Sequence, residues 1–125
     1  MPPIAPLLAV LALLAASPDE VTPAPAGRFY AVEFRTGPRW DAARPPGEQA
    51  HFQDHSQNLK KLRQEGRILL GGRYSDKGFL VLSGSSEEEI RKLFDADPSV
   101  ANQVFALEVH EFRPFYPGCV GAKGP

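Results

Sequence analysis

The sequence predicts an α+β domain of the ferredoxin-like class, in which two helices cover one face of an antiparallel sheet. Three observations support this prediction. Some segments alternate apolar and polar residues, as strands do, and others repeat apolar residues every three or four positions, as helices do. Clusters of Gly, Pro, Ser and Asp separate these segments. Along the chain the segments follow the order β-α-β-β-α-β.

The first half of the domain is predicted to hold a strand, a long loop and a helix. Residues 28–35 alternate and are rich in aromatic and β-branched side chains, which indicates a strand. Residues 36–47 are rich in Gly and Pro and carry the only tryptophan, Trp40. Residues 49–66 place His55 on a helical stripe with two leucines, and the glycine that ends this segment suits a C-terminal cap.

The second half is predicted to hold a hairpin, a helix and a last strand. Residues 67–83 contain two apolar segments around a Ser-Asp-Lys-Gly turn, which is typical of a hairpin. Ser85 or Ser86 can cap the following helix. Asp97 is expected to end that helix, because the residue before a proline disfavours the α region. Residues 104–112 alternate and form the last predicted strand.

The sheet face without helices is predicted to be of mixed polarity. It would carry Glu33 from the first strand and Glu108 and His110 from the last, among alanines and phenylalanines. Such a face is too apolar to be left in water and too polar for an ordinary core. A second copy packing face to face would satisfy both, with a pocket retained between the two sheets. The sequence therefore predicts a homodimer through the open sheet face.

The two ends of the chain are predicted to lie outside the folded domain. Residues 1–17 hold an apolar run that is too short for a stable membrane span and suits a signal peptide, although no Lys or Arg precedes it. Residues 18–27 read as a Pro/Ala-rich linker, residues 28–116 as the domain and residues 117–125 as a flexible tail. We therefore expect a secreted or periplasmic protein. An uncleaved anchor and a misassigned start codon are the alternatives, and the protein is cytoplasmic if the run is not a functional signal.

Composition argues against several partners and chemistries. The net charge is −1 and the charges are interspersed, so no basic stripe indicates nucleic acid. Cys119 is the only cysteine, so no intramolecular disulfide can form. Because Cys119 also lies outside the predicted core, no covalent catalysis is expected. His51 and His55 could face one metal, but a zinc site usually needs a third protein ligand. We therefore predict no metal and no other cofactor.

Four short segments, in their order and spacing, resemble the YCII-related (YciI-like) proteins, which are small dimeric α+β-barrel proteins of ferredoxin-like fold. The resemblance runs from about Tyr30 to Phe115, which is essentially the whole domain. The segments are Gly37-Pro38-Arg39-Trp40-Asp41 with Glu48-Gln49, His55 with Leu59, Leu62 and Gly66-Arg67, then Gly71-Gly72, and Asp97-Pro98 with Arg113-Pro114.

The resemblance implies that His55 and Asp97 form a His-Asp pair at the mouth of a pocket. A carboxylate that accepts the Nδ1–H of an imidazole fixes its tautomer and leaves Nε2 free to take a proton from substrate. From its position alone, the favoured interpretation of His55 is a core histidine whose nitrogens meet backbone carbonyls, and the resemblance reverses this preference. The chain departs from the family at Gly72-Arg73, where members commonly have Gly-Pro. Arg73 is therefore expected near the pocket rim or in solvent.

The remaining candidates for substrate binding are aromatic or titratable. Trp40 and Phe52 are expected to form a lid over the pocket or to belong to the core. His110 is expected to contact ligand or to hydrogen-bond across the dimer interface.

The resemblance implies lyase-type proton abstraction from a small organic molecule, since one family member is a dehydrochlorinase. The alternatives are a non-catalytic dimeric module that binds a small ligand, and an export-adapted relative with a degenerate site.

Overall fold

The computed structural model describes residues 28–121 of the chain. The predicted signal peptide, the predicted linker and the last four residues of the predicted tail lie outside the described residues. No helix within residues 28–121 is long and apolar enough to cross a membrane.

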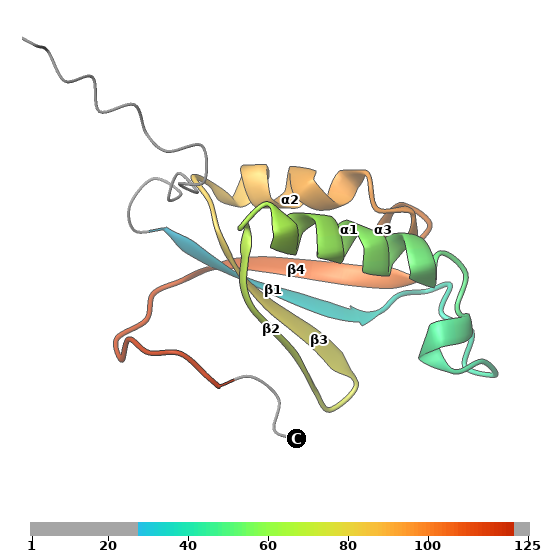
Figure 1. The fold of residues 1–125 in the computed structure, drawn as a ribbon. Coiled ribbons are helices and arrows are strands. Elements are labelled where there is room, and N and C mark those ends of the chain that lie inside the picture. Colours follow the sequence, from blue (N-terminus) through green and yellow to red (C-terminus); the bar gives the residue numbers. More distant parts are fainter. Residues whose placement is uncertain (1–27, 122–125) are drawn as a thin grey trace, which may run out of the picture.

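Four antiparallel strands form one sheet in the order β2-β3-β1-β4 (Figure 1). This order separates β1 from β2 by one strand, as a split β-α-β unit requires. The predicted ferredoxin-like fold is therefore confirmed. The strands are β1 (Phe29–Thr36), β2 (Ile68–Tyr74), β3 (Lys77–Ser83) and β4 (Phe105–Phe112).

The helices lie together on one face of this sheet (Figure 1). A short 3-10 turn, η1, precedes the first helix. The helical elements are η1 (Pro46–Glu48), α1 (Phe52–Gln64), α2 (Glu87–Asp95) and α3 (Pro98–Ala101).

The end of α1 follows from its sequence. Gly66 adopts a left-handed φ of 77°, which a glycine tolerates without steric cost. The backbone N–H of Gly66 then donates to the carbonyl of Arg63, and that of Arg67 donates to the carbonyl of Leu62. These two bonds make a Schellman motif, so the predicted glycine cap is confirmed.

The start of α2 uses both candidate serines. The Ser86 hydroxyl accepts from the backbone N–H of Glu89 at 3.1 Å, so Ser86 is the N-cap. The Glu89 carboxylate in turn accepts from the Ser85 backbone N–H at 2.7 Å, from the Ser85 hydroxyl and from Arg67. This is a capping box extended by one residue, and its arginine comes from the segment just before β2.

The short helix α3 was not predicted from the sequence. We expected Asp97 to end the second helix, but α2 ends at Asp95 and Asp97 is the N-cap of α3. The reason is that an aspartate followed by a proline also starts helices: the carboxylate caps the free N–H groups and proline fits the first turn.

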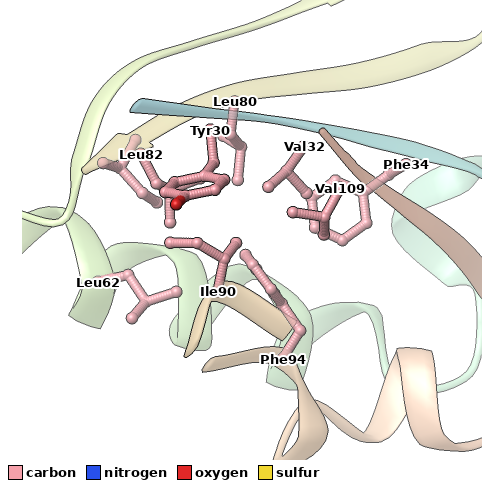
Figure 2. Packing of buried hydrophobic residues seen from close by; sticks show 10 residues of the cluster. Tyr30, Val32, Phe34, Leu62, Leu80, Leu82, Ile90, Phe94 and Val109 are labelled. Atoms are coloured by element: carbon pink, nitrogen blue, oxygen red, sulfur yellow. The ribbon is translucent and has the colours of Figure 1, made fainter. Parts of the chain in front are cut away.

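The core lies between the sheet and the helices (Figure 2). Alternate residues of the strands point toward the helices, and three helix residues meet them from the other side. From the strands these are Tyr30, Val32, Phe34, Ile68, Leu80, Leu82 and Val109, and from the helices Leu62, Ile90 and Phe94.

The opposite face of the sheet has the mixed polarity that the sequence predicts. Glu33 pairs across the strands with Glu108, and Arg35 holds these two carboxylates with contacts of 2.5 Å and 3.1 Å. The Tyr74 hydroxyl donates to Glu33 at 2.6 Å. The hydrogen bonds from Tyr74 and Arg35 lower the pKa of Glu33 below its ordinary value. His110 lies on this face as well, since it pairs with Ala31.

Candidate functional site

His55 and Asp97 meet at the inner side of α1. His55 is 7 % exposed and Asp97 is fully buried. Nδ1 of His55 lies 2.6 Å from Oδ2 of Asp97. The rings of Phe34 and Phe105 flank the imidazole, with centroid distances of 5.0 Å and 4.8 Å. The two residues therefore form a hydrogen-bonded pair in an apolar surrounding.

Ser99 completes the surroundings of the Asp97 carboxylate. Its backbone N–H and its hydroxyl both donate to Oδ1, at 3.0 Å and 2.7 Å. Burial raises the pKa of Asp97, but the hydrogen bonds from His55 and Ser99 outweigh burial and hold this pKa below its ordinary value. An ionised carboxylate only accepts hydrogen bonds, so Nδ1 of His55 is the nitrogen that carries the proton.

A pocket of about 600 Å³ lies beside this pair, and His55 lines it. The pocket is bounded by α1, by the turn end of the β2–β3 hairpin and by the loop around η1. It therefore lies on the helix side of the sheet within one protomer. The expectation of a pocket between two facing sheets does not describe this cavity. Its lining residues are Phe34, Thr36, Trp40, Pro46, Phe52, His55, Leu59, Gly71, Gly72, Arg73, Asp76, Gly78, Phe79, Leu80 and Phe105.

Glycines keep the sheet side of the pocket open. Gly71 pairs with Leu80 and Gly78 pairs with Arg73, so both glycines face the helix side of the sheet. A Cβ atom on Gly71 would lie 2.9 Å from Cδ2 of Leu80, closer than van der Waals contact allows. The Gly71-Gly72 pair, one of the segments that carry the family resemblance, thus borders the pocket with backbone alone.

The loop that carries Trp40 is fastened at two places. Gly37 donates to the carbonyl of Val104 at 2.8 Å, and a Cβ atom there would lie 2.1 Å from the carbonyl oxygen of Gln103. Gln49 is buried, and its amide bonds both the N–H and the carbonyl of Asp41, at 2.9 Å and 2.6 Å, and the carbonyl of Arg44 at 2.9 Å. Trp40 accordingly stands as a fixed wall of the pocket, with its ring 5.5 Å from that of Phe105.

The other candidates divide between two faces of the sheet. Phe52 and Arg73 line the pocket together with Trp40 and His55. His110 is not among the lining residues, because it points to the open face and lies 3.9 Å from Glu108. The structure thus brings five of the six candidates to one place, counting Asp97 behind the imidazole.

His51 and Cys119 lie apart from this pocket. His51 adopts a left-handed φ of 63° at the N-cap of α1, and its ring lies 3.6 Å from the Asp54 carboxylate. Cys119 is exposed in the C-terminal segment. Within residues 28–121 no three His, Cys, Asp or Glu side chains gather as they would around a metal ion.

Sequence reasoning missed three residues of this site. Ser99 carries a signal that could have found it, since Asp-Pro-Ser is the start of a capped helix. Gln49 could have been suspected as a polar side chain beside a Gly/Pro-rich loop that needs hydrogen bonds. Asp76 lies in a turn, where aspartate is common, so no local signal places it in the pocket.

Comparisons with known proteins identify the family of this chain. The family model described as the YCII-related domain matches residues 29–113. No curated protein matches the chain. One similar solved structure is 5-chloro-2-hydroxyhydroquinone dehydrochlorinase from Burkholderia phenoliruptrix AC1100, in complex with 2,5-dihydroxybenzoquinone. It is 20% identical, with a TM-score of 0.45, over 67% of this chain and 93% of that chain. Because the family match spans most of the chain, the protein belongs to the YCII-related domain family.

Proposed function

We propose that this domain is an enzyme that uses His55 as a general base on a small organic molecule, with Asp97 as the residue that orients the base. The observation that carries the proposal is the 2.6 Å contact between Nδ1 of His55 and Oδ2 of Asp97, in a histidine that also lines a pocket. The imidazole is thus held by a buried carboxylate and lies beside a cavity of about 600 Å³, and a general base needs both an orienting partner and access to substrate.

The chemistry follows from the tautomer. In the neutral imidazole whose Nδ1–H binds Asp97, Nε2 carries a lone pair, and no hydrogen-bond partner within residues 28–121 occupies it. A substrate C–H or O–H next to Nε2 can pass its proton to this lone pair. The imidazolium that forms is then stabilised by the Asp97 carboxylate. Departure of a leaving group from the neighbouring carbon would complete a lyase-like elimination.

The lining of the pocket favours proton transfer over covalent catalysis. Among its lining residues there is no serine, cysteine or lysine, and Thr36 is the only hydroxyl. Most of the wall is aromatic or aliphatic, which suits an organic body rather than a strongly polar one.

The test is a screen for turnover. Small hydroxylated and halogenated ring compounds are incubated with the protein in D2O, and NMR follows deuterium uptake and loss of substituents. His55→Ala should lower the rate on any reacting compound by about 10²- to 10⁴-fold, which is the usual contribution of a general base. His51→Asn is the matched control, because asparagine tolerates the left-handed N-cap. Full activity in His55→Ala would rule out the general-base role.

The second candidate is a module that binds a small ligand without turning it over. The size and apolar wall of the pocket favour binding by themselves. A thermal-shift screen distinguishes the two: ligands that stabilise both the wild type and His55→Ala, with no turnover in either, support the module. A screen that finds no stabilising ligand would count against both.

We further propose that the open sheet face forms a homodimer. Large apolar side chains are exposed there beside the bonded polar groups: Leu70 at 39%, Tyr74 at 47% and Phe112 at 38%. A second copy would cover this apolar area. In a two-fold dimer the Glu33–Arg35–Tyr74 cluster of one protomer would also pack against the same cluster of the other.

We also propose export through the N-terminal segment. Residues 1–17 have the apolar run and the small residues of a signal peptide. Mass spectrometry of the protein from its native cell should find the mature N-terminus near residues 15–17 or near residues 24–26. An intact Met1 in the mature protein would contradict cleavage.

A further inference from the structure

We propose that the pocket selects small organic monocarboxylates, with the carboxylate bound by Arg73 and the rest of the molecule lying on the apolar wall. This inference rests on the proposed function, since it names the substrate class of the same pocket. Arg73 lines the pocket, has no hydrogen-bond partner within residues 28–121 and shares the pocket lining with Asp76.

The neighbours of Arg73 on the helix-facing side of the β2–β3 hairpin are glycines. It pairs with Gly78 across the β2–β3 hairpin and follows Gly71 by two residues on the same face. Neither neighbour has a side chain that could cover the guanidinium or hold it away from the cavity. Arg73 therefore borders the same pocket as His55, and its side chain is exposed and accessible to a ligand.

The described part of the chain, residues 28–121, supplies no hydrogen-bond acceptor to the Arg73 guanidinium. Within residues 28–121, every arginine except Arg39 and Arg73 contacts a carboxylate or carbonyl oxygen of the chain. Arg39 does not line the pocket, whereas Arg73 does. A guanidinium presents a planar fork of donors that matches the two oxygens of a carboxylate, so a ligand carboxylate is the partner that completes it.

Two features limit the ligand to one negative charge. Asp76 also lines the pocket and would repel a second anionic group. The rest of the wall is dominated by aromatic and aliphatic residues such as Phe52, Leu59 and Phe105. Burying an unpaired charge against such a wall is costly, so a dicarboxylate or a phosphate dianion fits less well than a monocarboxylate.

The same cation suits the proposed proton transfer. When Nε2 of His55 removes a proton, negative charge grows on the substrate. A cation beside the reacting substrate lowers the energy of that charge. Arg73 would thus bind the substrate carboxylate and also stabilise the negative charge that grows during proton removal.

The experiment measures binding without turnover, through the fluorescence of the sole tryptophan, Trp40, which lines the pocket. Benzoate and its neutral isostere benzamide are titrated into the wild type, Arg73→Gln and Arg73→Lys. Arg39→Gln is the matched control, because it removes the same charge from an arginine outside the pocket. NMR of the ligands checks the affinities.

The wild type and Arg39→Gln should bind benzoate about tenfold more tightly than benzamide, which is the size of one charge-assisted hydrogen-bonded contact. Arg73→Gln should abolish this preference, and Arg73→Lys should retain part of it. Asp76→Asn should strengthen benzoate binding severalfold, and high salt should weaken benzoate binding but not benzamide binding. Equal binding of both ligands by the wild type, a preference that survives in Arg73→Gln, or no binding of either ligand would overturn the inference.

A further variant separates this inference from the proposed function. His55→Gln removes the base and should keep the preference for benzoate, since Arg73 is intact. Loss of the preference in His55→Gln, with Arg73→Gln unaffected, would assign the anion to the imidazole and overturn the role of Arg73. Benzoate selectivity without any turnover in the substrate screen would contradict the enzyme and leave the carboxylate site standing.

Discussion

Ser99 donates its backbone N–H and its hydroxyl to the same oxygen of Asp97, Oδ1, at 3.0 Å and 2.7 Å. The other oxygen, Oδ2, remains for Nδ1 of His55. The Asp97 carboxylate therefore caps α3 and also orients the imidazole. A substitution that disturbs one of these two contacts is expected to disturb the other. Because Asp97 and Ser99 are fully buried, water cannot replace a lost hydrogen-bond donor to the carboxylate.

The first prediction concerns Asp97→Asn. The amide oxygen can still accept from Ser99 and cap α3, but the amide NH2 group can only donate to Nδ1 of His55. The imidazole proton would move to Nε2, and the lone pair would face away from the pocket. Turnover should fall by about 10²- to 10⁴-fold while the fold persists.

Nitrogen NMR of the His55 ring reads the tautomer directly and needs no substrate. An Asp97→Asn protein whose imidazole still carries its proton on Nδ1 would show that Asp97 does not set the tautomer.

The second prediction concerns Ser99→Ala. The substitution removes one of the hydrogen bonds that lower the pKa of Asp97, so this pKa should rise toward its ordinary value. The free energy of unfolding should fall by about 1–3 kcal/mol, since a buried donor to a charged acceptor is lost. Carboxyl NMR titration and urea denaturation measure the two effects. Ser56→Ala, at an exposed position of α1, is the control and should change neither.

The third prediction is a loss of stability in acid through Glu89. The hydrogen bonds from the Ser85 hydroxyl, Arg67 and the Ser85 backbone N–H lower the pKa of Glu89 from 4.5 to about 2. A lowered pKa in the folded state stabilises the protein above the unfolded pKa, and this contribution is lost as the pH falls from about 4.5 through about 2.

Glu89→Gln should therefore cost about 1–2 kcal/mol near neutral pH, discounted because a third of the side chain is exposed. Urea midpoints at neutral pH and at about pH 3 should differ less in the variant than in the wild type. Glu88→Gln, at an exposed position of the same helix turn, is the control. Parallel acid curves for the wild type and Glu89→Gln would contradict the assignment.

The fourth prediction concerns the loop that carries Trp40. Gln49→Ala removes three hydrogen bonds that hold this loop, so Trp40 should become more mobile and more accessible to a quencher. Stability should also decrease by about 1–3 kcal/mol, because the backbone groups lose their partners. Fluorescence anisotropy and acrylamide quenching report on Trp40 alone. If Gln49→Ala quenches no more than Gln53→Ala, an exposed control on α1, the loop is held by other contacts.

The fifth prediction tests the homodimer. Phe112→Glu places a charge on the apolar part of the open face, and a dimer through this face should dissociate. Sedimentation velocity should show a dimer for the wild type and a monomer for the variant. Phe115→Glu makes the same change at a side chain that is 86% exposed beyond β4 and should remain dimeric. A monomeric wild type, or equal behaviour of the two variants, would refute assembly through this face.

Much of the fold was predictable because its signals are short-range. Tyr30, Val32 and Phe34 alternate along five residues of chain, and these three side chains are buried on one side of β1. The spacing of His55 and Leu62 marks the inner face of α1, where both are buried. The periodicity of a helix or strand depends only on residues that are close in sequence, so it can be recognised without knowledge of the rest of the molecule.

The sequence by itself therefore determined the order of the elements, the family, and a small set of candidate residues. Only the tertiary structure decided which candidates share a pocket. His55 and Asp97 are 42 residues apart, and their contact depends on how α1 and α3 pack. Arg73 faces the pocket and His110 faces away from it because strand register sets the side of the sheet on which each side chain lies. Register and packing join distant parts of the chain, and no local pattern encodes them.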